Sequence, residues 1–174
     1  MVTEREFKDF MAEVCTPVAV VTAMADGRPH GTTVGSLASL SLRPPMVTIA
    51  LDHRSALLSS VRRAGRFGVN LLGAGQAGLA RTFAAPVPDR FAEAAWYPDE
   101  GLPRLREAPG WLVCVPQRLI PGGDHVLLLS LVTRVGGTRA AAPLVYGRRT
   151  FGTHSAFTPR PGASITDQIA AFAR

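Results

Sequence analysis

The sequence predicts a mainly β domain in which antiparallel strands form a small barrel. β-Branched and apolar segments follow one another at hairpin spacing, and turn residues such as Asp26-Gly27 and Gly122-Gly123-Asp124 separate them. The regular helical crossovers of a parallel, doubly wound sheet are missing from this pattern. We therefore expect an antiparallel barrel with a few flanking helices.

The first helix is predicted at residues 3–14, ahead of the β segments. Thr3 and Glu6 stand three residues apart, as in a capping box at a helix start. Pro17 follows closely and marks the end of the helix. Four apolar residues recur on one helix face, namely Phe7, Phe10, Met11 and Val14.

From Val18 onward the pattern changes to β segments with two short helices between them. Ser55 stands as an N-cap before the first of these helices. The stretch 85–110 is long and rich in Pro, Asp and Glu, which is typical of a functional loop. Strands are expected at 18–23, 31–41, 46–51, 66–72, 111–121, 125–135 and 143–146, and helices at 55–64, 76–84 and 164–174.

Length and composition indicate one globular domain. The chain has 174 residues, 47% of them hydrophobic, and no apolar run that is long enough to span a membrane. The N-terminus lacks the layout of a signal peptide, so we expect a cytoplasmic protein with no membrane partner. Cys15 and Cys114 stand apart from other metal-ligating residues, so we expect two reduced thiols and no metal site.

The formal charge of +6 favours an anionic partner, such as a phosphorylated cofactor. The basic residues are scattered and only 7% of the residues are aromatic, whereas nucleic-acid surfaces use basic stripes and stacking aromatics. No Gly-rich dinucleotide fingerprint follows a strand, and no Walker sequence is present. We therefore expect a small phosphorylated ligand, held without a Rossmann turn or P-loop, and no nucleic-acid partner.

The segment 31–41 offers a wall for a flat polar ring. Its residues are small and many carry hydroxyl groups, which leave space and supply hydrogen-bond donors. Thr33, Ser36 and Ser39 are the candidates for ligand contact. The plainer alternative is a Ser/Thr-rich strand on a solvated face of the barrel.

A phosphate site is predicted where the helix at 55–64 begins. Main-chain amides at a helix start carry partial positive charge and point outward. Arg54 adds a cation and Ser55 adds a hydroxyl at this position. The alternative is an ordinary N-cap beside solvated arginines.

Two further segments contain candidate residues. In the turn 122–125, Asp124 is placed to orient a ring N–H of His125, and a histidine can bind phosphate or amide groups. In the segment 143–151, Arg149 lies among aromatic residues and can pair with a phosphate. The alternatives are a turn aspartate beside a half-buried histidine, and a solvated edge of the barrel.

One string of residues connects these segments in order. It reads Gly31-x-Thr33-x-x-Ser36-x-x-Ser39-x-Ser41-x-x-Pro44-Pro45, then Asn70-Leu71-Leu72, Phe83-Ala84, Arg90-Phe91, Gly123-Asp124-His125 and Pro143-Leu144-x-Tyr146-x-x-Arg149-x-Phe151. This string resembles the flavin reductase-like family of FMN-binding split barrels. Within that family it is similar to the short flavin reductases that serve two-component monooxygenases. The resemblance covers residues 7–153.

The resemblance implies an antiparallel, six-stranded split β-barrel with Greek-key connections over residues 1–154, and a homodimer that binds flavin between its subunits. Residues 155–174 fall outside it as a C-terminal extension. An apolar face of Ile165, Ile169 and Phe172 favours a helical arm across the dimer. A lid over the nicotinamide site and an unordered tail are the alternatives.

The resemblance also implies roles for individual residues. His125 would meet the nicotinamide dinucleotide and is the one residue assigned to catalysis. Arg54 and Ser55 would hold the flavin phosphate. All residues assigned to cofactor binding, by contact or by position, are Thr33, Ser36, Ser39, Arg54, Ser55, Asn70, Leu71, Phe83, Arg90, Asp124 and Arg149.

The implied activity is an NAD(P)H-dependent flavin reductase, which reduces FMN or FAD and supplies the reduced flavin to a partner monooxygenase. Hydride transfer between the two cofactors needs no acid–base pair from the protein. NADH is the expected hydride donor, with NADPH as an alternative. The sequence does not decide between FMN and FAD as the flavin. A non-catalytic flavin-binding or electron-transfer protein is the main rival function. A split-barrel oxidase of a small substrate, such as a pyridoxine phosphate, is a weaker one.

Overall fold

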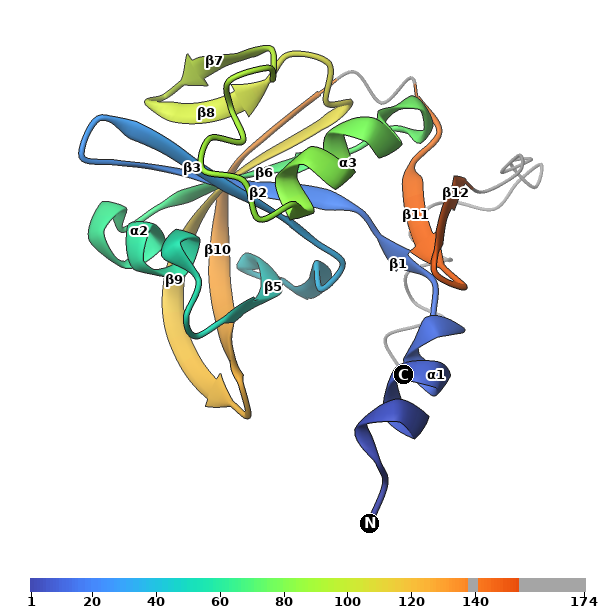
Figure 1. The fold of residues 1–174 in the computed structure, drawn as a ribbon. Helices are drawn as coiled ribbons and strands as arrows, with labels where there is room; N and C mark the ends of the chain where they lie inside the picture. Colours follow the sequence, from blue (N-terminus) through green and yellow to red (C-terminus); the bar gives the residue numbers. More distant parts are fainter. Residues whose placement is uncertain (138–140, 154–174) are drawn as a thin grey trace, which may run out of the picture.

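The computed structural model describes residues 1–137 and 141–153. Antiparallel strands form its main sheet, which is strongly curved (Figure 1). In spatial order its seven strands are β3 (Arg28–Val34), β2 (Ala19–Ala25), β6 (Phe67–Leu71), β9 (Gly110–Gly122), β10 (His125–Gly137), β5 (Pro45–Asp52) and β4 (Ala38–Leu42). The edge strands β3 and β4 are consecutive along the chain. The prediction of a mainly β, antiparallel domain is confirmed.

The main sheet has seven strands where six were expected, because segment 31–41 is divided between β3 and β4. Ser36 lies at the break. Its side chain, in place of a backbone ladder, bonds to β5: Oγ donates to the Ala50 carbonyl at 3.1 Å and accepts from the Ala50 amide at 3.0 Å. The chain thus leaves one edge of the sheet at β3 and enters the opposite edge at β4.

Two smaller sheets accompany the main one. β1 (Thr16–Pro17), β11 (Leu144–Gly147) and β12 (Thr150–Thr153) form the first, and β7 (Trp96–Asp99) and β8 (Leu102–Leu105) form a hairpin. This hairpin lies inside the stretch 85–110, which was expected to be a loop. Proline in both of its strands conceals the β pattern in the sequence.

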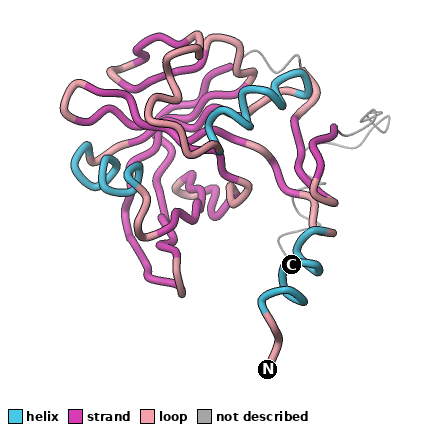
Figure 2. The backbone as a smooth tube through the Cα atoms, in the orientation of Figure 1, coloured by secondary structure: helices cyan, strands magenta, loops and turns pink. Residues whose placement is uncertain are grey.

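Two α-helices lie against the body of strands, and the N-terminal helix projects away from it (Figure 2). α1 (Glu4–Ala12) begins at the predicted Thr3 capping box, α2 (Ala56–Ala64) begins at the predicted N-cap, and α3 (Ala77–Ala84) follows the short 3₁₀ turn η1 (Ala74–Gln76). These helices confirm the predictions for 3–14, 55–64 and 76–84. The predicted helix at 164–174 and the extension at 155–174 lie outside the described residues. Within the described residues, no helix is long and apolar enough to cross a membrane.

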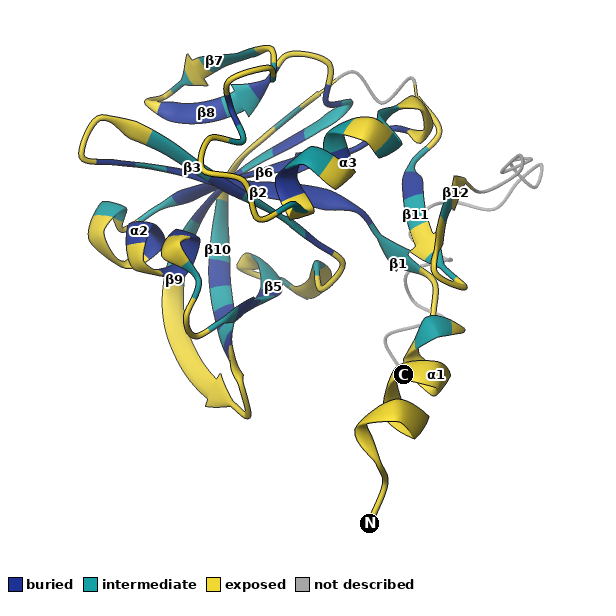
Figure 3. Cartoon of the chain, in the orientation of Figure 1, coloured by how far each residue is buried: buried dark blue, intermediate teal, exposed yellow. Residues whose placement is uncertain are grey.

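The core lies on both faces of β2, which is why this strand is apolar almost throughout. Ala19, Val21 and Ala23 face α2, whereas Val20 packs in a second cluster with α3. Figure 3 shows the buried central strands and α1, which has no buried residue and is exposed over most of its length.

Both cysteines are free thiols, as predicted. Cys15 is exposed after α1, and Cys114 is buried in β9. Burial raises the pKa of Cys114 to about 12, because the low-dielectric interior disfavours the thiolate. Cys114 is therefore a packing residue at neutral pH and not a nucleophile.

Candidate functional site

A groove of about 330 Å³ lies where the end of β3 meets β5, β10 and the start of α2. We call it the central groove. It brings together four of the predicted site residues, which come from segments far apart in the sequence. The lining consists of Thr32, Thr33, Val34, Gly35, Ser36, Ala50, Leu51, Asp52, Ser55 and His125.

Strand register explains why these segments meet. β10 pairs with β5 so that His125 stands opposite Asp52, at the end of β5. The chain then turns into α2, with the Ser55 amide donating to the Asp52 carbonyl at 2.9 Å. The two bonds between Ser36 and Ala50 bring the end of β3 to the same place. The predicted helix start and the predicted hydroxyl wall are thus parts of one site.

His125 is held in position by the residue before it. Its Nδ1 lies 2.7 Å from Oδ1 of Asp124, so Nε2 is the ring atom left for a ligand. This hydrogen bond is the main reason why the pKa of Asp124 lies below its usual value. The carboxylate is therefore ionised at neutral pH, and the pair is lost only as the pH falls below the ordinary carboxyl range. The predicted geometry of Asp124 and His125 is present.

His53 fixes the turn that carries this pair, a role that the sequence did not reveal. The Asp124 carbonyl oxygen lies 3.1 Å from the His53 amide nitrogen and 2.7 Å from Nδ1 of its ring. These contacts join the β9–β10 turn to the start of α2. Arg54 lies beside them but outside the groove lining, because its exposed guanidinium pairs with Asp52 at 3.5 Å.

The hydroxyl groups of the predicted wall are largely bonded within the protein. Thr33 donates from Oγ1 to the Ala80 carbonyl of α3 at 2.7 Å, and Ser36 donates to Ala50. Both residues line the central groove, as expected, but the expectation that their hydroxyls donate to a ligand does not fit these bonds. The acceptors come from segments that sequence spacing does not connect with β3.

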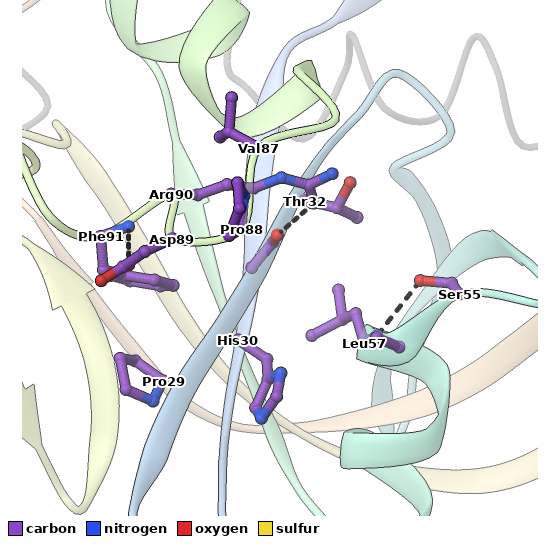
Figure 4. Close-up of a pocket in the computed structure, with 12 residues that line it drawn as sticks. Pro29, His30, Thr32, Ser55, Leu57, Val87, Pro88, Asp89, Arg90 and Phe91 are labelled. Carbon is purple, nitrogen blue, oxygen red and sulfur yellow. Dashed lines mark hydrogen bonds between the residues drawn. The ribbon is translucent and has the colours of Figure 1, made fainter.

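Arg90 lines a second cavity of about 290 Å³, which we call the distal pocket (Figure 4). Its guanidinium is fixed by two carbonyls: Nε donates to Ala85 at 2.9 Å and Nη1 donates to Gly31 at 2.8 Å. The distal pocket shares Thr32 and Ser55 with the central groove. The two cavities are therefore neighbours across the start of α2.

Asn70 and Leu71 do not lie at the central groove. Asn70 is fully buried, and its Nδ2 donates to the Val20 carbonyl at 3.2 Å while its Oδ1 accepts from the Leu105 amide at 2.8 Å. Its backbone pairs with strands on both sides. Leu71 lines a separate apolar pocket beside Trp111. The expected main-chain contacts of this pair with a ring are thus replaced by a structural role.

Three other predicted residues also lie away from the central groove. Phe83 is buried and packs edge-to-face on Phe91, with 4.9 Å between ring centroids. Ser39 is exposed on the edge strand β4. Arg149 lies in the β11–β12 turn and forms an ion pair with Asp9 of α1. The sequence string therefore mixes groove residues with residues that hold the fold.

Comparison with known proteins agrees with this architecture. The family model for the flavin reductase like domain matches residues 11–155. The reductase component of a 4-nitrophenol 4-monooxygenase/4-nitrocatechol 2-monooxygenase from Rhodococcus opacus is 37% identical over 148 residues, covering 84% of this chain and 79% of the relative. An NADH:riboflavin 5'-phosphate oxidoreductase from Streptomyces pristinaespiralis is 37% identical over 159 residues, covering 89% and 90%.

A solved structure extends the similarity to three dimensions. The NADH:FAD oxidoreductase from Streptomyces globisporus C-1027, in complex with NAD and FAD fragments, superposes with a TM-score of 0.83 at 29% identity. The match covers 94% of this chain and 99% of that chain. With a family match over most of the sequence, relatives aligned over nearly their whole length and the same fold, this chain belongs to the flavin reductase like domain family.

Proposed function

We propose that this protein is an NAD(P)H-dependent flavin reductase that reduces FMN or FAD. The observation that carries the proposal is the central groove, where His125, oriented by Asp124, faces a wall of small residues and the start of α2. A protein that only stores flavin has no use for a histidine held in this way. The relatives named above are reductases and support the same assignment.

The residues of the groove fit a flat, anionic ligand. Small residues such as Gly35 and Ala50 line the wall, and the Ser55 end of α2 favours a phosphate. Because the hydroxyls of Thr33 and Ser36 are bonded within the protein, we assign the hydrogen bonds of the ring to main-chain groups of residues 33–36. When bound, the flavin accepts a hydride from the nicotinamide, and the protein supplies position and electrostatics.

A turnover assay tests this function against the rival flavin-binding role. Purified protein is mixed with NADH or NADPH and an excess of free FMN or FAD, and the nicotinamide absorbance is followed. We expect oxidation of many equivalents of NADH per protein, because free flavin is the substrate. A single equivalent, followed by no further reaction, would support a non-catalytic flavoprotein instead.

We also propose that reduced flavin passes to a flavin-dependent monooxygenase. The Rhodococcus opacus relative is named as the reductase component of such a system. We place this exchange in the cytoplasm, since both cysteines are free thiols, as they are in a reducing compartment. Hydroxylation of a monooxygenase substrate, driven by this protein and NADH, is the corresponding measurement.

The exposed face of α1 supports a homodimer. Phe7 is 59% exposed and Phe10 is 70% exposed, and no residue of this nine-residue helix is buried. So short a helix is marginal in water without tertiary packing. Ion pairs and one main-chain bond join it to the β11–β12 turn, while its apolar side packs on no described element (Figure 3). We infer that a second copy of the chain covers the apolar side of α1.

The dimer proposal predicts the effect of one substitution in α1. Phe10→Ser is expected to shift the protein from dimer to monomer, because it removes the most exposed aromatic side chain of the apolar face. Lys8→Ser, on the charged side of the same helix, should leave the dimer intact. Light scattering after size-exclusion chromatography gives the mass. A monomeric wild-type protein would contradict the assignment.

A further inference from the structure

The distal pocket extends the central groove beyond the start of α2. Thr32 and Ser55 line both cavities, so the distal pocket adjoins the central groove. The pocket lies between β3, the first turn of α2 and the loop 87–91. His30 projects from β3 on one side of it, and Arg90 lies with the loop on the other side (Figure 4).

The charged and polar groups of this pocket fit a phosphate next to a base. Arg90 is anchored through two of its five donors by carbonyls, and no carboxylate neutralises it in the described part of the chain. A fixed, uncompensated guanidinium is a good partner for phosphate. Asp89 accepts the Phe91 amide on Oδ1 at 2.8 Å, so its second oxygen is left as an acceptor for an amino group.

Part of the remaining lining is apolar and suits the faces of a flat heterocycle. Pro29 and Pro88 present rigid apolar surfaces, and Leu57 closes the side towards α2. The half-buried His30 ring adds a surface for stacking together with a polar nitrogen. A purine with an exocyclic amino group matches this set of an acceptor, apolar walls and an aromatic ring.

We propose that the distal pocket binds the adenosine phosphate portion of a dinucleotide and that His30 is its specificity-determining residue. This inference rests on the proposed function, in which FAD and NAD(P)H both carry an adenosine phosphate and FMN does not. The flavin ring then lies in the central groove. His30 contacts ligands that carry an adenosine phosphate beyond Ser55 and makes no contact with FMN, which ends at its phosphate.

The test compares FAD, FMN and NADH on the His30→Ala protein. Dissociation constants for FAD and FMN are measured by quenching of flavin fluorescence without NADH, and the KM for NADH is measured with FMN as acceptor. If the pocket holds the adenylate of FAD, the dissociation constant for FAD rises about tenfold and that for FMN is unchanged. If it holds the adenylate of NADH, the KM for NADH rises by about the same factor and both flavin constants stay fixed.

Two further variants sharpen the result. Arg28→Ala removes an exposed charge from the same strand outside the pocket, and it should change none of the three values. Asp89→Asn keeps an acceptor for the Phe91 amide, so the loop is preserved, and it should weaken the same ligand as His30→Ala. This variant keeps the test decisive if His30→Ala lowers stability.

Two outcomes overturn the proposal. In the first, all three values are unchanged in both pocket variants. In the second, the constants for FMN and FAD rise equally, which would place a part common to both flavins in the pocket. Failure of the reductase function is a separate result: wild-type protein would bind both flavins in the fluorescence assay but would not turn over NADH.

Discussion

His125→Ala is expected to lower kcat/KM for NADH by about ten- to a hundredfold while flavin affinity is unchanged. The ring is fixed through Nδ1 by Asp124, which leaves Nε2 for the nicotinamide dinucleotide in the central groove. The loss corresponds to one hydrogen bond with a charged or strongly polar group. Steady-state kinetics with NADH varied at saturating FMN, and fluorescence quenching for the flavin, give the two quantities.

Asp124→Asn separates the catalytic residue from its positioning residue. The amide oxygen can still accept from Nδ1 of His125, so most of the orientation is kept, but the negative charge is lost. We expect a smaller fall in kcat/KM than for His125→Ala, together with a changed pH profile. The assignment of His125 fails if its replacement by Ala weakens flavin binding and leaves the NADH kinetics as they were.

The fold was predictable where local signals and the long-range structure agree. The Thr3 capping box and the Ser55 N-cap begin helices where the sequence predicts them, because these bonds form between residues two or three positions apart. The Asp124–His125 bond was predictable for the same reason. The β7–β8 hairpin was not, since its strands contain prolines and its Asp99 pairs with Arg134, which lies 35 residues further along the chain.

The candidate site was less predictable because hydroxyl and amide side chains have several possible partners. Sequence spacing places Thr33 and Ser36 on one segment, but it does not show that carbonyls of α3 and β5 take their hydroxyl hydrogens. Neither does it show that Arg90 bonds back to β3, 59 residues earlier. Residue types therefore located the groove, while the tertiary contacts decide which of its groups face a ligand.

Asn70 is the residue for which the sequence prediction and the structure differ most, and Asn70→Ala tests the structural role. The substitution leaves the Leu105 amide and the Val20 carbonyl without their side-chain partner in the core. We expect the free energy of unfolding to fall by about 3 kcal/mol, since each buried group left unpaired costs about 1–3 kcal/mol. Urea denaturation measures the loss, and the flavin dissociation constant of the folded protein should not change.

Thr22→Val is the matched control for this prediction. Thr22 is also fully buried; its Oγ1 donates to the Pro103 carbonyl at 2.7 Å and lies 3.4 Å from Nδ2 of Asn70. Valine fills the same volume but removes that donor, so the protein should lose about 1–3 kcal/mol. Because the two side chains share one network, the double variant should lose less than the sum of the single losses. Full additivity would show that the two side chains act independently, and weaker flavin binding with unchanged stability would return Asn70 to the flavin site.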